Sequence, residues 1–233
     1  MTEKFPEIRN LALFHDISTQ SFETLTRAAY VQTYPPSTEL ITEGDAPDFL
    51  YVVQAGAVEL FANWAHRETS MWTVWPQSTF ILAATVKNRP YLMSGRTLCK
   101  SRVVLLPSAD VRNVFETDGA FAKAIVTELA NGYRGAIKNS KNLKLRSSLE
   151  RLANYLLTCY RQCDKAPRFL LEAQKSRLAS NLGMTPENLS RALNGLKKYG
   201  VAVDGQSVEL TDIKALTDFA QPSLLIDDDT PFF

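Results

Sequence analysis

The sequence has few of the side chains on which catalysis and metal binding depend. It contains two histidines and three cysteines among 233 residues, and it has no glycine-rich phosphate loop, clustered metal ligands or nucleophile elbow. An enzyme would therefore have little acid–base material to work with. No apolar run approaches the roughly 18 residues that cross a bilayer, and the N-terminal MTEKFPEIRN lacks a secretory apolar region. We therefore expect a non-enzymatic protein of the cytoplasm.

The chain does contain enough apolar material for globular cores, and its charge is unevenly distributed. With 45% hydrophobic and 10% aromatic residues, its length fits two modest domains. Residues 140–220 hold 13 Lys/Arg against 8 Asp/Glu, whereas the rest of the chain holds 13 against 17. A basic C-terminal half beside an acidic N-terminal half is typical of a protein in which one half contacts nucleic acid.

Residues 185–200, TPENLSRALNGLKKYG, predict a capped amphipathic helix. Thr185 offers a side-chain oxygen for the N-cap, and Pro186 suits the first helical position, where a backbone N–H is not needed. Gly200 stands where a glycine commonly ends a helix. Three leucines recur at helical spacing and predict a buried stripe: Leu189, Leu193 and Leu196.

The face opposite these leucines carries side chains that are able to recognise DNA bases. Glu187, Ser190 and Arg191 are three and four residues apart, so they point in a common direction. Arg clamps guanine, Glu accepts a hydrogen bond from the cytosine amino group, and Ser adapts to either kind of partner. The alternative to base recognition, if this helix is taken alone, is an ordinary surface helix whose charges are solvated.

The flanking segments favour the DNA-binding interpretation. Upstream, QKSRLASNLG predicts a short helix that ends at Gly183, and downstream Asp204-Gly205 separates two alternating strands, as in a β-hairpin. Helix, turn, helix and hairpin together predict a winged helix-turn-helix. Within it we assign DNA contact to seven residues, with the two basic residues of the first helix on phosphates and Asn188 as a further phosphate candidate: Lys175, Arg177, Thr185, Glu187, Asn188, Ser190 and Arg191.

The stretch GMTPENLSRALNGLKKYGV resembles the DNA-binding module of the Crp/Fnr family. It is closer to the Fnr/FixK-like branch, whose Glu-x-x-Ser-Arg constellation matches Glu187, Ser190 and Arg191. The cAMP-receptor branch has Arg before the Glu and Gly at the Ser position. This chain has Pro186 and Ser190 there, so that branch's DNA target does not carry over. The resemblance implies an effector-responsive homodimer that binds a TTGAT-N4-ATCAA-like palindrome and works with RNA polymerase.

The N-terminal half predicts a β-rich sensor domain. Leu13–Ser18 and Ser21–Tyr30 suggest short helices, and Thr38–Asn63 predicts three strands joined by turns. Short apolar runs at Met71–Trp75 and Val103–Leu106 complete a small antiparallel barrel or jelly roll. Across roughly residues 10–117 this pattern resembles the cyclic-nucleotide-binding domain. The expected fold class is therefore α+β, with a β jelly roll, a long helix and a winged helix-turn-helix.

The cyclic-nucleotide cassette of that domain is not reproduced here. Where the cassette has a Gly-Glu pair for the ribose and an Arg-Ser pair for the phosphate, this chain has Leu82-Ala83 and, in this register, Tyr91-Leu92. A buried phosphate without a guanidinium is strongly disfavoured, so we expect neither cAMP nor cGMP. A packed pocket without ligand is one alternative. The other is a small aromatic or organic acid bound by Lys87, Arg89, Tyr91, Met93 and Arg96.

The sequence predicts no cofactor. The iron–sulfur sensors of the family carry a cysteine cluster near the N-terminus, whereas this chain has no cysteine before Cys99, so no iron–sulfur cluster is expected. Cys159 and Cys163 are expected to be packing thiols. Haem needs an axial ligand, and neither His15 nor His66 lies in a diagnostic motif. A haem-based gas sensor of the same fold stays open as an alternative, and so does a cyclic-nucleotide-type regulatory subunit that acts through protein contacts.

The segment between the two halves, residues 120–142, predicts a long helix with an apolar seam, and the resemblance to the Crp/Fnr family implies a dimerisation helix at this position. Small residues in its apolar seam would let two helices approach closely, although a single core-facing helix is the alternative. The seam comprises Phe121, Ala124, Ile125, Leu129, Tyr133, Ala136 and Ile137. A further helix, Ser147–Cys163, is expected to pack the DNA-binding domain. We therefore expect a sensor domain (1–118), a helix and hinge (119–146), a DNA-binding domain (147–220) and a tail (221–233) that is either poorly ordered or a strap.

Overall fold

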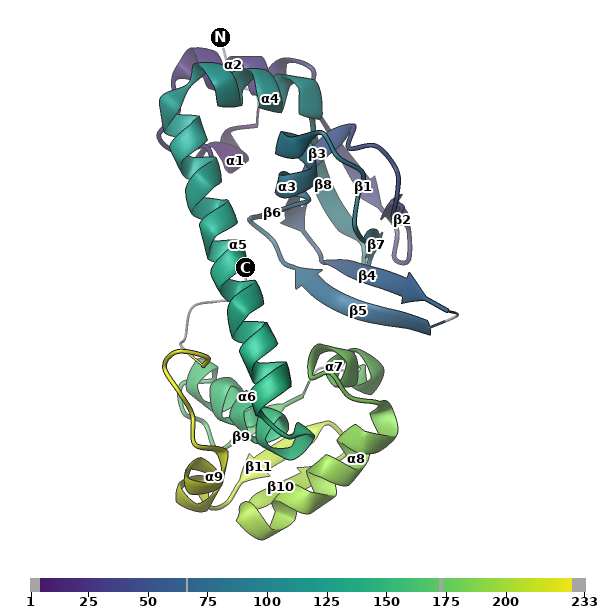
Figure 1. Ribbon diagram of the computed structural model, residues 1–233, viewed down its shortest axis with the longest axis vertical. Coiled ribbons are helices and arrows are strands. Elements are labelled where there is room, and N and C mark those ends of the chain that lie inside the picture. The colour runs from purple at the N-terminus through teal and green to yellow at the C-terminus, as the bar shows by residue number, and fades with distance from the viewer. Residues whose placement is uncertain (1–4, 66, 172–173, 228–233) are drawn as a thin grey trace. The chain divides into compact units, whose positions relative to one another are not determined.

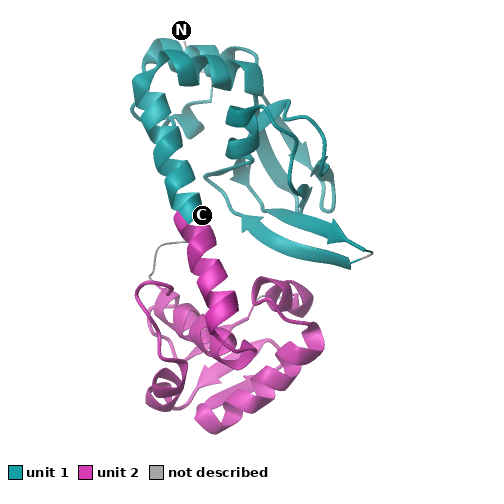
Figure 2. Cartoon of the chain, in the orientation of Figure 1, with its two compact units in different colours: residues 1–133, 233 teal, residues 134–232 magenta. Residues whose placement is uncertain are grey.

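The computed structural model describes residues 5–65, 67–171 and 174–227. The chain divides into two compact units, residues 1–133 and 134–232, and the boundary falls inside the long helix α5 (Gly119–Leu145) (Figure 1, Figure 2). The first unit is rich in strands, and the second combines helices with a small sheet, which confirms the predicted α+β class. Among the described helices, none has an apolar stretch long enough to span a membrane.

Within the described residues, the first unit forms two antiparallel four-stranded sheets, with the orders β1-β8-β3-β6 and β2-β7-β4-β5. The strands are β1 (Tyr30–Tyr34), β2 (Glu39–Ile41), β3 (Phe49–Ala55), β4 (Val58–Trp64), β5 (Arg67–Val74), β6 (Ser78–Phe80), β7 (Ser94–Thr97) and β8 (Ser101–Pro107). The sequence pattern predicted β2 to β5 and β8, but it missed β1, β6 and β7.

The sheet that contains β3 is covered on both faces. Leu50 and Val52 point into a cluster shared with the helices of this unit, whereas Tyr51 and Val53 point into the space between the two sheets. A strand that is buried on both faces needs a continuous apolar run rather than an alternating one. This explains why the segment was visible in the sequence as an uninterrupted apolar stretch.

The helices of the first unit are α1 (Pro6–Arg9), α2 (Thr19–Arg27), α3 (Leu82–Lys87), α4 (Ser108–Thr117) and the first part of α5. The predicted helix over Leu13–Ser18 is wrong, because this segment forms turns. The Arg9 guanidinium binds two backbone carbonyl groups of this segment. Its Nη1 donates to the carbonyl of Phe14 (2.8 Å), and its Nη2 donates to the carbonyl of Ile17 (2.7 Å). Ser18 then N-caps α2, which corresponds to the second predicted helix.

Helix α5 has a buried start and an apolar outer stripe. Its first turns place Phe121 and Ile125, both fully buried, in the helix-side core of the first unit. Further along, Val126, Tyr133 and Ile137 are 60%, 69% and 44% exposed. The predicted seam is therefore divided: its N-terminal members stabilise the chain's own core, while Tyr133 and Ile137 remain uncovered.

The second unit contains α6 (Ser148–Gln162), β9 (Arg168–Leu170), α7 (Lys175–Asn181), α8 (Pro186–Gly195), the 3₁₀ helix η1 (Leu196–Tyr199), β10 (Val201–Asp204), β11 (Ser207–Leu210) and α9 (Ile213–Ala220). A capping box starts α6: the Ser147 hydroxyl accepts from the Glu150 amide (3.3 Å), and the Glu150 carboxylate accepts from the Ser147 amide (2.7 Å). This matches the helix predicted from Ser147 onward.

The predicted hairpin is present as β10 and β11, and β9 extends it into a three-stranded sheet of order β10-β11-β9. Asp204 pairs with Ser207, so the two-residue turn is Gly205-Gln206, one residue later than expected. Glycine at the first position of such a turn is the type II′ pattern. Neither β9 nor α9 was predicted from the sequence.

Candidate nucleic-acid interface and small-molecule pocket

Helix α8 is built as its sequence predicts, although it is shorter. The Thr185 hydroxyl accepts a hydrogen bond from the Asn188 amide at 3.3 Å, and Pro186 occupies the first turn. The three leucines of the predicted stripe are at most 6% exposed. The regular helix ends at Gly195, and η1 continues it to Gly200, which adopts φ +78°.

The outer face of α8 presents the predicted base-reading side chains together. Glu187, Asn188, Ser190 and Arg191 are all exposed. The pKa of the Glu187 carboxyl is lowered by a hydrogen bond from its own amide, by the Thr185 hydroxyl and by the charge of Arg191. Ser190 donates its hydroxyl hydrogen to the Pro186 carbonyl at 3.1 Å. The face therefore offers an ionised acceptor beside a guanidinium.

Basic side chains flank this face on the neighbouring elements. Lys175 at the start of α7 is exposed, whereas Arg177 is partly buried and donates to the Gln174 side-chain oxygen at 2.7 Å. Lys197 and Lys198 on η1 are also exposed, and the Lys198 ammonium lies 4.9 Å from the centre of the Tyr199 ring. This lysine pair was given no role from the sequence, although its place two residues before Gly200, the glycine that ends the helix, was a visible signal.

A buried arginine holds the turn between α7 and α8. Gly183 adopts φ +61° in this turn, a left-handed conformation that favours glycine, and a Cβ atom there would meet the end of the Leu143 side chain. Arg151 of α6 is 8% exposed and donates to the carbonyls of Leu182 (2.7 Å) and Gly183 (3.1 Å). Arg151 was missed from the sequence, where the only signal was one basic residue within the apolar stripe of the predicted helix.

The five candidate effector residues do not share one pocket. Lys87 and Arg89 are exposed at and just beyond the end of α3, and Tyr91 and Met93 pack against the apolar cluster between the sheets. Arg96 lies in a separate pocket of about 480 Å³, whose lining is mostly polar: Ser37, Glu39, Thr42, Phe61, Asn63, Glu68, Ser94 and Arg96.

The charge of Arg96 is already neutralised within that pocket. Its guanidinium contacts the carboxylates of Glu59 (2.7 Å) and Glu68 (2.6 Å) and lies 4.4 Å from the centre of the Phe61 ring. The hydrogen bond to Glu68 and the attraction of both carboxylates raise the pKa of Arg96. A ligand carboxylate would have to displace a glutamate, so this arginine is a weak anion receptor as it stands.

Aromatic side chains fill the space between the sheets. The rings of Tyr51 and Phe80 stack with their centres 4.9 Å apart, and Tyr91 is buried beside them. Burial and the neighbouring Tyr91 raise the pKa of Tyr51. At the cassette positions, Leu82 is buried and Leu92 is 83% exposed. These positions carry neither a carboxylate nor a guanidinium for a cyclic nucleotide.

The remaining cofactor candidates are scattered. His15 is exposed and its Nδ1 lies 2.7 Å from the Asp16 carboxylate, while His66 falls outside the described residues. Cys99 and Cys163 are exposed, and Cys159 packs against the core of the second unit. Across the described ranges, no group of three or more His, Cys, Asp or Glu side chains is arranged to hold a metal ion.

Comparison with known proteins gives a consistent result for both units. A model of the Crp-like helix-turn-helix domain matches residues 150–219, and a model of the cyclic nucleotide-binding domain matches residues 31–118. A comparison with curated protein sequences gives no match.

Solved structures share the fold at low sequence identity. FixK2 from Bradyrhizobium japonicum is 20% identical over 84% of this chain and 99% of that one, with a TM-score of 0.69. A CooA variant from Carboxydothermus hydrogenoformans is 18% identical over 94% and 97%, with a TM-score of 0.71. The catabolite activator protein of Thermus thermophilus is 21% identical over 90% and 98%, with a TM-score of 0.50.

Proposed function

Because the chain belongs to the Crp/Fnr family of transcription regulators, we propose that it binds a palindromic operator of the type TTGAT-N4-ATCAA as a homodimer. It is a DNA-binding regulator and not an enzyme. The operator sequence, the dimer and a cytoplasmic partnership with RNA polymerase are parts of the proposal.

The observation that carries the proposal is the exposed face of α8. Arg191 is suited to clamp the guanine of each half-site, Glu187 to accept from the amino group of the paired cytosine, and Ser190 to contact a neighbouring thymine. Glu187 is an exposed carboxylate and is therefore ionised and able to accept at neutral pH. Pro186 offers no polar side chain, so we expect the outermost bases to be discriminated weakly.

A selection from randomised duplex DNA tests the operator directly. We expect enrichment of a palindrome with one G·C pair in each half-site at the position that Arg191 contacts. No enrichment, or enrichment of a palindrome without that pair, would contradict the assignment of Glu187, Ser190 and Arg191.

The exposed stripe on α5 supports the homodimer. Val126, Tyr133 and Ile137 are seven and four residues apart, which is the spacing of a helix that packs against a second helix. Large exposed apolar side chains in a row mark an interaction surface. A two-fold dimer requires a two-fold operator, so the palindrome follows from this stripe.

For the sensor domain we propose an effector that is not a cyclic nucleotide, such as a small organic or aromatic acid; to pair with Arg96, such an acid would have to displace Glu59 or Glu68. The support is the aromatic filling between the sheets and the apolar residues at the cassette positions. Native mass spectrometry of protein purified from its own host would weigh a retained ligand. Isothermal titration with cAMP is expected to show no binding, and a micromolar affinity for cAMP would contradict the proposal.

A further inference from the structure

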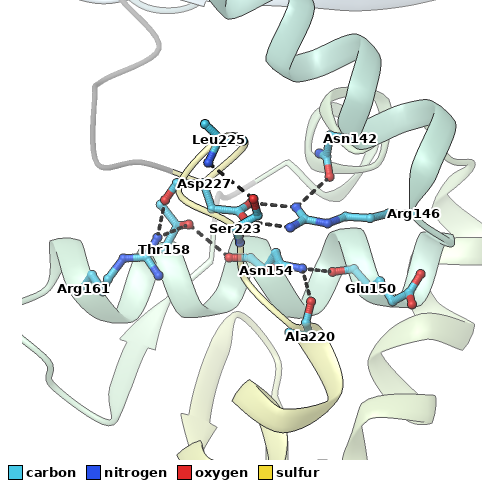
Figure 3. A network of polar contacts seen from close by, with 10 residues as sticks. All are labelled: Asn142, Arg146, Glu150, Asn154, Thr158, Arg161, Ala220, Ser223, Leu225 and Asp227. Carbon is cyan, nitrogen blue, oxygen red and sulfur yellow. Dashed lines mark hydrogen bonds and ion pairs between the residues drawn. The ribbon is translucent and has the colours of Figure 1, made fainter.

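The segment that follows α9 returns to α6 and to the end of α5 (Figure 3). We call residues 221–227 the C-terminal strap and residues 142–147 the joint between α5 and α6. In the strap, Ile226 is 8% exposed, whereas Leu224 and Leu225 face outward at 85% and 72% exposure. The strap is therefore anchored by few apolar contacts, and polar contacts decide its position.

Arg146 is the residue of the joint that the strap holds. Its Nη1 and Nη2 donate to the two carboxylate oxygens of Asp227, each at 2.6 Å, and Nη1 also donates to the Asn142 side-chain oxygen at 3.2 Å. The side chains of Arg146 and Asp227 are only 9% and 10% exposed. Removal of one partner would leave the other charge buried and unpaired, so a fork of this kind resists separation.

Helix α6 holds the chain just before the strap and at the end of the strap. At Ala220, the last residue of α9, the backbone carbonyl accepts a hydrogen bond from the Asn154 amide group at 2.8 Å. Near its end, Arg161 donates to the Asp227 carbonyl at 3.1 Å. The Ser223 amide closes the strap on itself by donating to the Asp227 carboxylate at 2.8 Å.

The same joint is tied to the turn of the helix-turn-helix. The Arg146 carbonyl accepts from Arg151 at 2.7 Å, and Arg151 in turn donates to the carbonyls of Leu182 and Gly183. Arg146 therefore contacts the strap through its side chain, and its backbone carbonyl is linked through Arg151 to the turn between α7 and α8.

We propose that the C-terminal strap locks the joint between α5 and α6 through Asp227, and thereby limits the motion of the DNA-reading helices on the dimerisation helix. A locked joint presents α8 in fewer orientations, so less conformational entropy is lost when it binds. The consequence for DNA binding rests on the proposed function, whereas the locking of the joint does not.

Point variants of the full chain test the strap. Asp227→Asn removes the charge, Arg146→Gln removes its partner, and Asp218→Asn makes the same charge change at an exposed carboxylate of α9 as the matched control. Amide hydrogen exchange over residues 142–151, measured without DNA, reports on the joint, and fluorescence anisotropy on the selected operator reports on binding.

We expect the rate of amide exchange at the joint to rise about tenfold or more in Asp227→Asn and in Arg146→Gln. The double variant should show no further rise, because both substitutions break the same ion pair between Arg146 and Asp227. Asp218→Asn should leave exchange unchanged. Arg146→Lys keeps the charge but not the fork, so it should give a smaller rise and serves as a second test if Arg146→Gln unfolds. DNA affinity should fall several-fold in the two strap variants, with base preference unchanged.

Unchanged exchange in Asp227→Asn would overturn the proposal, and so would effects of the two single changes that add in the double variant. An equal rise in Asp218→Asn would overturn it as well, because the effect would then come from net charge. If neither the wild type nor any variant bound DNA, the proposed function would fail while the exchange data still decided the role of the strap.

Discussion

On the outer face of α8, Glu187 and Arg191 carry opposite charges four residues apart, so one side chain accepts hydrogen bonds and the other donates them. The pKa of Glu187 is lowered by its own amide first, then by Thr185 and Arg191, so the surroundings favour the charged form of this acceptor. The Arg191 side chain is exposed, and its positive charge contributes to the lowered pKa of the Glu187 carboxyl. The pair is therefore suited to the two members of one G·C pair.

Arg191→Ala should weaken operator binding by about 1–3 kcal/mol per half-site and relax the preference at the G·C pair alone. Arg191→Lys is the matched comparison, because it keeps the charge and loses the two-point contact with guanine. Anisotropy titrations against operators substituted at each position would measure both effects. Equal losses on all operators would show that Arg191 contacts the phosphate backbone.

Lys175 and Arg177 should act on phosphates, since they lie on α7 and not on the reading face. Replacement of either residue by Ala should reduce affinity for all sequences alike and reduce the slope of log affinity against log salt by about one unit. Titrations at several salt concentrations would show this. A changed base preference with the slope intact would contradict the assignment.

Asp118 should make the stability of the first unit sensitive to acid. Hydrogen bonds from Ser21 and from the amides of Phe121 and Ser18 lower the pKa of Asp118 from 3.8 to about 2. A carboxyl with a lowered folded-state pKa stabilises the fold above its unfolded pKa, and this contribution is lost as the pH falls from about 4 toward 2. Asp118→Ala should lower the free energy of unfolding at neutral pH by roughly 1 kcal/mol, as for an N-cap. It should also weaken the dependence of this free energy on pH between about 4 and 2. Urea unfolding at several pH values would measure both effects, and an unchanged pH dependence would contradict the role of Asp118.

At the scale of elements, capping decides where α8 begins. The Thr185 hydroxyl is the side-chain acceptor of its first turn. Thr185→Ala should lower the free energy of unfolding by about 1 kcal/mol, whereas Thr185→Ser should restore most of it because serine caps equally well. Thermal melts of the three proteins would show the order. Equal melting temperatures would mean that tertiary packing alone holds this helix end.

Elements with local signals were predictable, and elements that depend on distant partners were not. Helix α8 was predictable from Thr185-Pro186, and the hairpin was predictable from Gly205. The conformational preferences of these residues act within a few positions of the chain. Strands β6 and β9 have three residues each and exist because β3 and β11 pair with them. Such short runs carry no periodicity to detect.

The same distinction applies to the candidate site. The face of α8 follows from helical spacing, so its residues were found together, as they stand in the structure. The effector candidates were chosen along a loop whose path was unknown, and the structure distributes Lys87, Tyr91 and Arg96 over three environments. Arg151 was missed because its partners, the carbonyls of Leu182 and Gly183, are 31 and 32 residues away in the sequence.

For the whole molecule, an effector should change DNA affinity and leave the dimer intact. In the proposed dimer the stripe of α5 joins the two copies, and a ligand shifts this dimer toward the conformation that it binds better. The two copies of α8 must lie about 34 Å apart to meet successive major grooves. Sedimentation with and without effector should give the same mass, and a monomer that dimerises on ligand addition would refute this mechanism.

The pairing of β8 with β1 and β3 also has a consequence during synthesis. Tyr30 pairs with Leu105, and Leu50 pairs with Leu106. The sheet of order β1-β8-β3-β6 therefore cannot form until residues near 107 have left the ribosome. At roughly 5–20 residues per second, the apolar run of β3 waits on the order of seconds in an unpaired state. During that interval the nascent chain displays a strand that the mature protein covers on both faces.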